Sequence, residues 1–164
     1  MKHLTLLRHA KSSWKDPECD DFDRPLNKRG RQNAPLTGQR LAMLGEVPEI
    51  IISSPAKRAR RTAELVAAAL PYQASAIRYE PCIYEAGLGT LVELVSQLDD
   101  DWQNVMLVGH NPGLTDLANA LAPCKLDNIV TCGVVKLVFR VDSWRDIQLH
   151  SGRLLFYDYP GAGE

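Results

Sequence analysis

The sequence predicts an α/β fold in three layers, with helices on both faces of a mainly parallel central sheet. Short apolar segments typical of strands alternate along the chain with segments of helical periodicity. Three of the apolar segments end abruptly in polar residues, which is where parallel sheets bind their ligands. The chain has 164 residues, 45% of them hydrophobic, enough for one domain with its own core. We therefore expect a single domain over residues 1–164.

The expected strands and helices follow from periodicity. Runs of apolar and β-branched residues predict strands, whereas apolar residues spaced three and four apart predict helices. Strands are expected over residues 2–8, 49–53, 77–79 and 105–109, and a hairpin over residues 129–141 and 147–157. Helices are expected from Asn27 to about Leu44, from Ser54 to about Leu70, from Thr90 to Leu98 and from Asn111 to about Leu121.

Capping residues and prolines predict where the helices begin. Asn27 is expected to cap the first helix, which contains Pro35, a residue that kinks or splits helices. Ser54-Pro55 and Asn111-Pro112 each combine a capping side chain with a proline suited to the first helical turn. A polar loop over residues 11–26 follows the first strand, and loops of this length are usually functional or disordered.

Composition excludes several classes of protein. The net charge of −1 gives no reason to expect nucleic-acid or membrane binding, and no apolar stretch reaches the ~20 residues of a membrane span. The four cysteines form no CxxC pair and lack zinc-finger spacing to histidine, so we expect neither a metal site nor a cofactor. The apolar run after Lys2 is too short for a secretory signal. We expect reduced thiols and a cytoplasmic location.

Chemistry-bearing residues follow three of the predicted strands. The first strand ends in Arg8-His9, the second in Ser53-Ser54 with Arg58 one turn into the next helix, and another in Gly109-His110. Imidazole is a good neutral nucleophile near pH 7, and guanidinium matches the oxygens of phosphate. Because parallel strands bring these ends together beside helix N-termini, we expect a phosphate pocket.

These motifs carry a resemblance to a known family. The sequence resembles the histidine phosphatase superfamily, whose Arg-His-Gly motif corresponds to Arg8-His9-Ala10. The resemblance continues through residues 54–62, which match Ser-Pro-x-x-Arg-Ala-x-x-Thr, and through residues 108–112, Val-Gly-His-Asn-Pro. The short chain and the segment Asp23-Arg24-Pro25-Leu26 are similar to the SixA-type phosphohistidine phosphatase branch. The resemblance implies a phosphoglycerate mutase-like fold. Ala10 replaces the usual glycine, which requires a negative φ there.

The resemblance implies a role for each matching residue. His9 would accept the phosphoryl group, while Arg8, Arg58 and His110 would hold its non-bridging oxygens, and the neighbouring cations should lower the pKa of His9. Glu85 would serve as the general acid or base, with the loop acids Asp16, Asp20 and Asp21 as alternatives. Arg24 and Asn111 are further candidates for contact with the substrate.

Three functions remain open at this point. The first is a metal-independent phosphatase acting on phosphohistidine in a protein, such as a histidine phosphotransfer domain of two-component signalling. The second is a phosphatase of small phosphate esters or of phosphoserine and phosphothreonine. The third is a phosphoprotein-binding module without turnover, against which a nucleophilic His9 argues. The sequence assigns no purpose to the basic cluster at residues 57–61.

Overall fold

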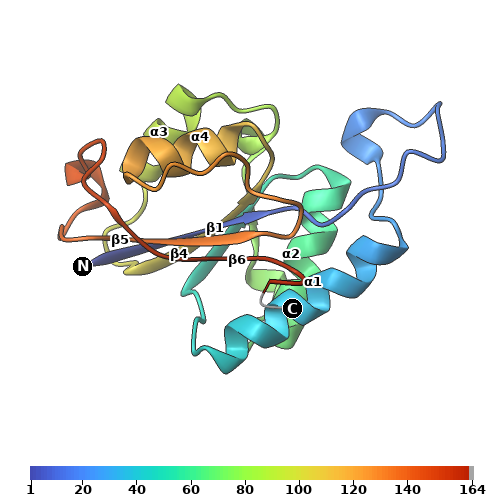
Figure 1. The fold of residues 1–164 in the computed structure, drawn as a ribbon, viewed down its shortest axis with the longest axis horizontal. Coiled ribbons are helices and arrows are strands. Elements are labelled where there is room, and N and C mark those ends of the chain that lie inside the picture. The colour runs from blue at the N-terminus through green and yellow to red at the C-terminus, as the bar shows by residue number, and fades with distance from the viewer. Residues whose placement is uncertain (163–164) are drawn as a thin grey trace.

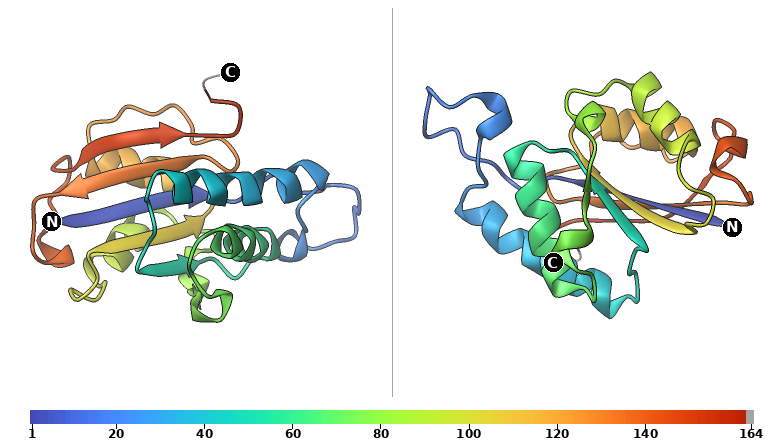
Figure 2. Two further views of the ribbon diagram at one scale, coloured as in Figure 1. Left: turned by 90° about the horizontal axis from the view of Figure 1, so that it is seen from below. Right: turned by 180° about the vertical axis from the view of Figure 1, so that it is seen from behind.

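A six-stranded sheet lies between two pairs of helices in the computed structural model, which describes residues 1–162. Helices α3 and α4 cover one face of the sheet, and α1 and α2 cover the other (Figure 1). The strand order is β3-β2-β4-β1-β5-β6, as the two further views make plain (Figure 2). Strand β5 runs against its neighbours β1 and β6, while β3, β2, β4 and β1 are parallel. The predicted three-layer, mainly parallel α/β fold is confirmed.

The strands and helices occur in the expected order. The strands are β1 (Lys2–Arg8), β2 (Ile50–Ser53), β3 (Arg78–Tyr79), β4 (Asn104–Gly109), β5 (Val134–Phe139) and β6 (Arg153–Asp158). The α-helices are α1 (Lys28–Met43), α2 (Lys57–Ala69), α3 (Leu88–Ser96) and α4 (Gly113–Leu121). Short 3₁₀ turns η1 to η4 lie at Asp21–Asp23, Ala74–Ala76, Pro81–Ile83 and Trp144–Asp146. Within residues 1–162, no helix combines the length and apolarity needed to cross a membrane.

The two faces of the sheet carry separate apolar cores. Alternate residues of β1 supply them: Leu4 and Leu6 pack toward α3 and α4, whereas Leu7 packs toward α1 and α2. Strands β1 and β4 are almost completely buried along their length, as central strands of a sheet covered on both faces must be. The two cores hold the carboxyl ends of these strands rigidly at one edge of the sheet.

Some predicted helix boundaries were wrong, and polar contacts of Ser54 explain one of them. Helix α2 begins at Lys57 instead of Ser54, whose hydroxyl accepts a bond from the Ala56 N–H and also contacts a histidine. Helix α4 begins at Gly113, one residue after Pro112, and α3 begins at Leu88 instead of Thr90. Helix α1 is not split, since it runs without a break through Pro35. Asn27 caps it as expected.

The hairpin was predicted in the correct place but with strands that were too long. Strands β5 and β6 pair antiparallel, but β5 begins only at Val134. The preceding residues leave the sheet because Cys132 has a left-handed backbone (φ 61°) and its N–H bonds the carbonyls of Arg8 and His9. This segment therefore closes around the end of β1 instead of extending β5.

The loop over residues 11–26 is closed at its base. The N–H of Asn27 donates to the carbonyl of Lys11 (2.9 Å), and that of Ser13 donates to Pro25 (2.8 Å). Gly30 of α1 packs so closely on Lys11 that a Cβ there would lie 2.2 Å from its carbonyl oxygen. The rest of the loop projects away from the sheet (Figure 1).

Candidate active site

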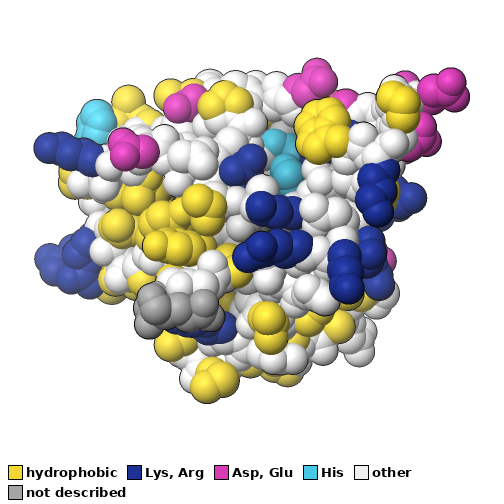
Figure 3. All heavy atoms as spheres, turned by 45° about the vertical axis from the view of Figure 1, so that its right-hand side comes forward, with side chains coloured by type: hydrophobic (Ala, Val, Ile, Leu, Met, Phe, Trp, Pro, Cys, Tyr) yellow, Lys and Arg dark blue, Asp and Glu magenta, His cyan; other side chains and the backbone are white. Residues whose placement is uncertain are grey.

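The register of the sheet brings three chemistry-bearing strand ends together. Arg8 of β1 pairs with Gly109 of β4, and Ser53 of β2 pairs with Val108 of the same strand. The residue after each strand is thus His9, Ser54 or His110, and all three lie at one edge. Histidine side chains line a hollow flanked by Lys and Arg side chains on this side of the molecule (Figure 3). The three strand ends converge at one edge of the sheet, as the sequence predicts.

His9 is held as a neutral imidazole with one nitrogen directed by the backbone. Its Nδ1 lies 2.7 Å from the carbonyl oxygen of Ala10, which can only accept, so Nδ1 carries the hydrogen and Nε2 keeps its lone pair. The side chain is 6% exposed. Burial is the main cause that lowers the pKa of His9 to about 3, with smaller contributions from His110, Arg58 and Arg8. His9 is therefore an unprotonated base at neutral pH.

Ala10 keeps a negative φ, as its side chain requires, and it is fully buried. Its N–H donates to the Thr62 hydroxyl (3.0 Å), which in turn donates to the Arg58 carbonyl (2.7 Å). Thr62 thus links the residue after His9 to helix α2. This contact explains why the motif at residues 54–62 includes a threonine.

His110 lies beside His9, with ring centroids 5.2 Å apart and planes tilted by 51°. Its Nε2 is 2.7 Å from the Ser54 hydroxyl, while its buried Nδ1 has no hydrogen-bond partner among residues 1–162. Burial, followed by the charge of Arg58, lowers the pKa of His110 to about 4. His110 therefore keeps one nitrogen available to bond a ligand oxygen.

The two arginines approach the histidines from different elements. Arg8 at the end of β1 donates from Nη1 to the carbonyl of Ile129 (3.0 Å), and its buried Nε is unpartnered within the described chain. Arg58, in the first turn of α2 and 6% exposed, likewise has a buried Nε without a partner in residues 1–162. These two guanidinium groups supply fixed positive charge for an oxyanion.

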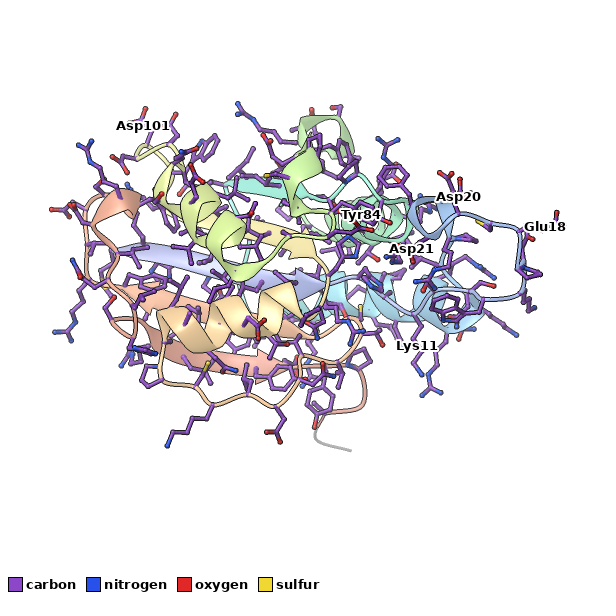
Figure 4. All side chains as sticks on the ribbon, turned by 90° about the horizontal axis from the view of Figure 1, so that it is seen from above. Lys11, Glu18, Asp20, Asp21, Tyr84 and Asp101 are labelled. Carbon is purple, nitrogen blue, oxygen red and sulfur yellow. The ribbon has the colours of Figure 1, made fainter. Side chains whose placement is uncertain are left out.

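Asp21 of the loop occupies the outer side of Arg58. Arg58 donates from Nη1 to the Asp21 carbonyl (2.6 Å) and from Nη2 to its carboxylate (3.0 Å). The Tyr84 hydroxyl donates to the same carboxylate oxygen (2.6 Å), and Figure 4 shows these two side chains facing each other. The Tyr84 bond, together with the Arg58 and Arg24 contacts, lowers the pKa of Asp21 to about 2. Asp21 is therefore a carboxylate at neutral pH and holds no proton to donate.

Arg24 is buried behind Asp21. Its Nε donates to the Asp21 carboxylate (3.1 Å), its Nη1 donates to the Ser12 hydroxyl (2.6 Å), and its guanidinium lies 3.5 Å from the ring centroid of Trp14. These contacts hold the loop in shape. A direct contact between Arg24 and a substrate stays a prediction.

Asn111 follows His110, but its carboxamide is engaged by the protein. Its Nδ2 donates to the carbonyls of Asn128 (side chain) and Ile129 (backbone), both at 2.8 Å, and its Oδ1 accepts from the Thr115 hydroxyl. The Ile129 carbonyl is also the acceptor for Arg8. Asn111 is thus tied to the segment that holds Arg8, and its predicted contact with substrate is untested.

Glu85 is exposed and has a left-handed backbone, with a φ of 58°. Such a conformation is uncommon for a residue with a side chain and is often found at functional sites. The preceding residue, Tyr84, packs edge-on against His110 at a centroid distance of 5.6 Å. Glu85 therefore lies next to the site, and its role as acid or base stays a prediction.

Sequence reasoning missed Ser54 as the partner of His110, and it missed Tyr84 entirely. Tyr84 lies directly before Glu85, and its side chain bridges Asp21 and His110. No local pattern in the sequence marks a tyrosine for this position.

In the part of the chain described, no group of three or more His, Cys, Asp or Glu side chains is placed to hold a metal ion. The fold and the site together define an α/β protein that brings two neutral imidazoles and two guanidinium groups to one edge of its sheet.

Comparison with known proteins gives the family. The model of the histidine phosphatase superfamily (branch 1) matches residues 4–112, so the chain belongs to this superfamily of phosphatases. A crystal structure of a proposed phosphohistidine phosphatase SixA from Agrobacterium tumefaciens is 30% identical, with a TM-score of 0.82, covering 98% of this chain and 99% of that one. The predicted resemblance to the superfamily and its SixA-type members is confirmed.

The chain is also similar to curated relatives, of which two show the range of their names. An uncharacterized chloroplastic protein of Arabidopsis thaliana is 31% identical over 159 residues, covering 92% of this chain and 72% of that protein. The mitochondrial serine/threonine-protein phosphatase PGAM5 of Xenopus laevis is 44% identical over 70 residues, which cover 43% of this chain and 25% of that protein. Of these two relatives, one is named as a phosphatase and the other carries no functional name.

Proposed function

We propose that this protein is a metal-independent phosphohistidine phosphatase that acts on a phosphorylated protein. The observation that carries the proposal is the bond from His9 Nδ1 to the Ala10 carbonyl, which leaves Nε2 unprotonated beside two guanidinium groups and His110. The 30% identity to the proposed SixA of Agrobacterium tumefaciens, over nearly the whole of both chains, supports phosphohistidine as the substrate.

The reaction takes place in two displacements on phosphorus. In the first, the lone pair of His9 Nε2 forms a P–N bond while the P–N bond to the substrate imidazole breaks, and the released imidazole takes up a proton from solvent. In the second, water attacks phosphorus, the P–N bond to His9 breaks, the proton that water loses goes to solvent, and inorganic phosphate leaves with His9 neutral again. Arg8, Arg58 and His110 hold the equatorial oxygens, whose charge must be balanced in both transition states.

Two guanidinium groups supply the positive charge that Mg²⁺ supplies in kinases, so the proposed reaction needs no metal. Phosphohistidine has an imidazole as its leaving group, and this group departs with less help from an acid than an alkoxide needs. The carboxylate that contacts Arg58, Asp21, is ionised and cannot protonate a leaving group, which suits phosphohistidine better than an alkyl ester. The four cysteines are free thiols, which supports the cytoplasm as the location.

A phosphatase of phosphoserine or phosphothreonine, or of small esters, is the second candidate. The 44% identity with PGAM5 over 70 residues favours it, because that relative is named as a serine/threonine-protein phosphatase. Glu85, which follows the Tyr84 that contacts His110, is the carboxyl group available to protonate an alkoxide in this case.

The deciding experiment is a substrate panel. Release of inorganic phosphate is measured from a phosphohistidine protein, a phosphoaspartate protein, a phosphoserine peptide and p-nitrophenyl phosphate, each with and without EDTA. The proposal expects the highest kcat/KM on the phosphohistidine protein and no change in EDTA. Preference for phosphoserine assigns the protein to the second candidate, and loss of activity in EDTA that a divalent ion restores refutes metal independence.

A further inference from the structure

A groove of about 510 Å³ lies beside the phosphate pocket, between the loop and helix α2. Its apolar lining comes from Phe22, Pro25 and Leu26 of the loop and from Pro55 before the helix. Phe22 packs edge-on against Tyr84 at 5.1 Å, so the wall of the groove is continuous with the wall of the phosphate pocket. The groove is a separate depression, because none of the proposed catalytic residues lines it.

The groove has a surplus of positive charge. Its basic lining residues are Arg31, Lys57, Arg60 and Arg61, and its acidic ones are Asp23 and Glu64. Among residues 1–162, the one ion pair between these groups joins Arg61 to Glu64, at the long distance of 3.9 Å and on an exposed surface. Such a pair contributes little. Arg31 donates to the Leu26 carbonyl (2.8 Å) and the Arg60 guanidinium lies 4.6 Å from the ring centroid of Tyr79, and both contacts leave the positive charge of these side chains unneutralised. We call this depression, with its four basic lining residues, the cationic groove.

Helix α2 presents two sets of cations on different faces. Arg58 points inward, buried, to the phosphate pocket, whereas Lys57, Arg60 and Arg61 are exposed. The free N–H groups at the start of α2 add positive potential at the end of the helix where Pro55 and Lys57 line the groove. The basic cluster at residues 57–61 is therefore divided: one member belongs to the site for the phosphoryl group and the other three face the cationic groove.

We propose that the cationic groove docks an acidic segment of the phosphoprotein substrate. The proposal rests on the proposed function, since it assigns the groove to the molecule that brings the phosphoryl group to His9. The apolar floor of Phe22, Pro25 and Leu26 accepts aliphatic side chains, and the surrounding cations complement carboxylates. Charge complementarity of this kind favours association and selects among partners. A small phosphate ester fills only the phosphate pocket and does not reach the groove.

Position also supports this assignment. Phe22 follows Asp21, whose carboxylate contacts Arg58, and Pro55 follows Ser54, which contacts His110. A chain lying in the groove is thus separated from the phosphate pocket by the backbone at residues 21–22 and 54–55. A residue presented to His9 and an acidic stretch near it in the substrate can be bound at the same time.

The experiment begins with binding, which does not depend on turnover. Two fluorescein-labelled twelve-residue peptides of equal length are compared by anisotropy, one with Glu and Leu around a central histidine and one with Gln in place of Glu. The test variant combines Lys57→Gln, Arg60→Gln and Arg61→Gln, which keep the side-chain stems and remove the charges. The control variant combines Arg140→Gln, Arg145→Gln and Arg153→Gln, exposed residues that do not line the groove.

The acidic peptide is expected to bind the wild-type protein more tightly than the neutral one, in a salt-dependent manner. The test variant should bind the acidic peptide about tenfold more weakly than the wild type does, and the affinity of the control variant should stay within about twofold of the wild-type value. Equal binding of the two peptides, or equal weakening by both variants, overturns the proposal. Displacement of the peptide by a single-stranded RNA of the same length at lower concentration assigns the groove to nucleic acid and also overturns it.

Turnover then separates this proposal from the proposed function. The test variant should raise KM for the phosphorylated acidic peptide without changing kcat, and should leave hydrolysis of p-nitrophenyl phosphate unchanged. A matching loss on the small ester means that these residues support the phosphate pocket, which overturns the docking proposal. Failure of the wild-type protein on the phosphohistidine peptide, with groove-dependent binding intact, refutes the phosphohistidine substrate and leaves the docking of acidic segments supported.

Discussion

Asp21 binds the guanidinium of Arg58 through two different groups, its backbone carbonyl at 2.6 Å and its carboxylate at 3.0 Å. A phosphoryl group that bonds the remaining N–H groups of Arg58 shares this guanidinium with the Asp21 carboxylate, and the two anions repel each other. Replacing the carboxylate with an amide should therefore favour phosphate.

The Asp21→Asn variant is expected to bind tungstate or inorganic phosphate about tenfold more tightly, because one negative charge close to the anion is removed. Competitive inhibition of p-nitrophenyl phosphate hydrolysis measures this affinity. Asp20→Asn is the matched control, since it removes the same charge one residue away (Figure 4). Weaker inhibition of Asp21→Asn would show that Asp21 orients Arg58 for the phosphate instead of competing with it.

Removal of Arg58 should damage catalysis more than folding. Arg58→Ala deletes one charge-assisted contact to the transition state, which should cost roughly 2–4 kcal/mol of barrier. The kcat/KM for p-nitrophenyl phosphate and the melting temperature are measured together, with the exposed Arg61→Ala on the same helix as control. An unchanged kcat/KM in Arg58→Ala would reduce Arg58 to a structural partner of Asp21.

Turnover should pass through a phosphorylated His9. His9→Ala is expected to lose activity by roughly a thousandfold or more, since the proposed mechanism gives the role of nucleophile to His9 and the role of binding phosphate oxygens to His110. Quenched wild-type enzyme should carry a phosphoryl group on His9 that is labile to acid and stable to base, detected by mass spectrometry. Near-normal activity of His9→Ala, with its fold verified by circular dichroism, would refute the covalent intermediate.

Glu85 should matter in proportion to the leaving group. Glu85→Gln keeps the shape and removes the acid, so it should slow hydrolysis of an alkyl phosphate strongly and of phosphohistidine weakly. The kcat/KM values of both enzymes on both substrates give the comparison. Equal loss on the two substrates indicates that Glu85 positions phosphate or water, and no loss on either excludes it from the reaction.

Acidification should destabilise the protein through its two active-site histidines. Their pKa values of about 3 and about 4 in the folded protein lie below the ordinary 6.5, so the folded state binds fewer protons than the unfolded chain below pH 6.5. The free energy of unfolding is then fully retained above pH 6.5 and falls as the pH drops toward 4, by up to about 1.4 kcal/mol per pH unit for each histidine.

Urea denaturation at pH 7, 5.5 and 4.5 measures this effect, and the His9→Asn variant should show a smaller loss of stability over the same range. Asp21 contributes little over this range, because its pKa of about 2 in the folded protein and its ordinary value of 3.8 both lie below pH 4.5. Identical pH profiles for the wild type and His9→Asn would show that His9 titrates normally in the folded protein.

The fold and the centre of the site could be predicted because their signals are local. Two apolar runs each indicate, within a few residues, both a strand and the reactive side chain that follows it. One ends in Arg8-His9 and the other in Gly109-His110. The parallel register then places these ends together without further information. Helix starts at Ser54 and Asn111 were predicted less well, because both side chains serve the site as well as the helix.

The outer part of the site depends on contacts that are distant in sequence. Asp21 contacts Arg58, which is 37 residues away in the sequence, and Tyr84, which is 63 residues away. No periodicity in the sequence links these positions. The low pKa of His9 was predicted from its cationic neighbours, yet burial is its larger cause. Burial of a strand-end residue depends on how residues 129–133 fold back over it, which the hairpin pattern did not show.

The closed base of the 11–26 loop has a consequence for how this protein can diversify. Since the bonds at Lys11, Ser13 and Asn27 fix both ends of the loop, residues inserted or lost beyond them change its reach without moving the strand that carries His9. Lengthening a flexible loop twofold costs only about 0.6 kcal/mol. Evolution can therefore vary this segment, and with it the surface offered to substrates, while the chemistry of phosphoryl transfer stays constant.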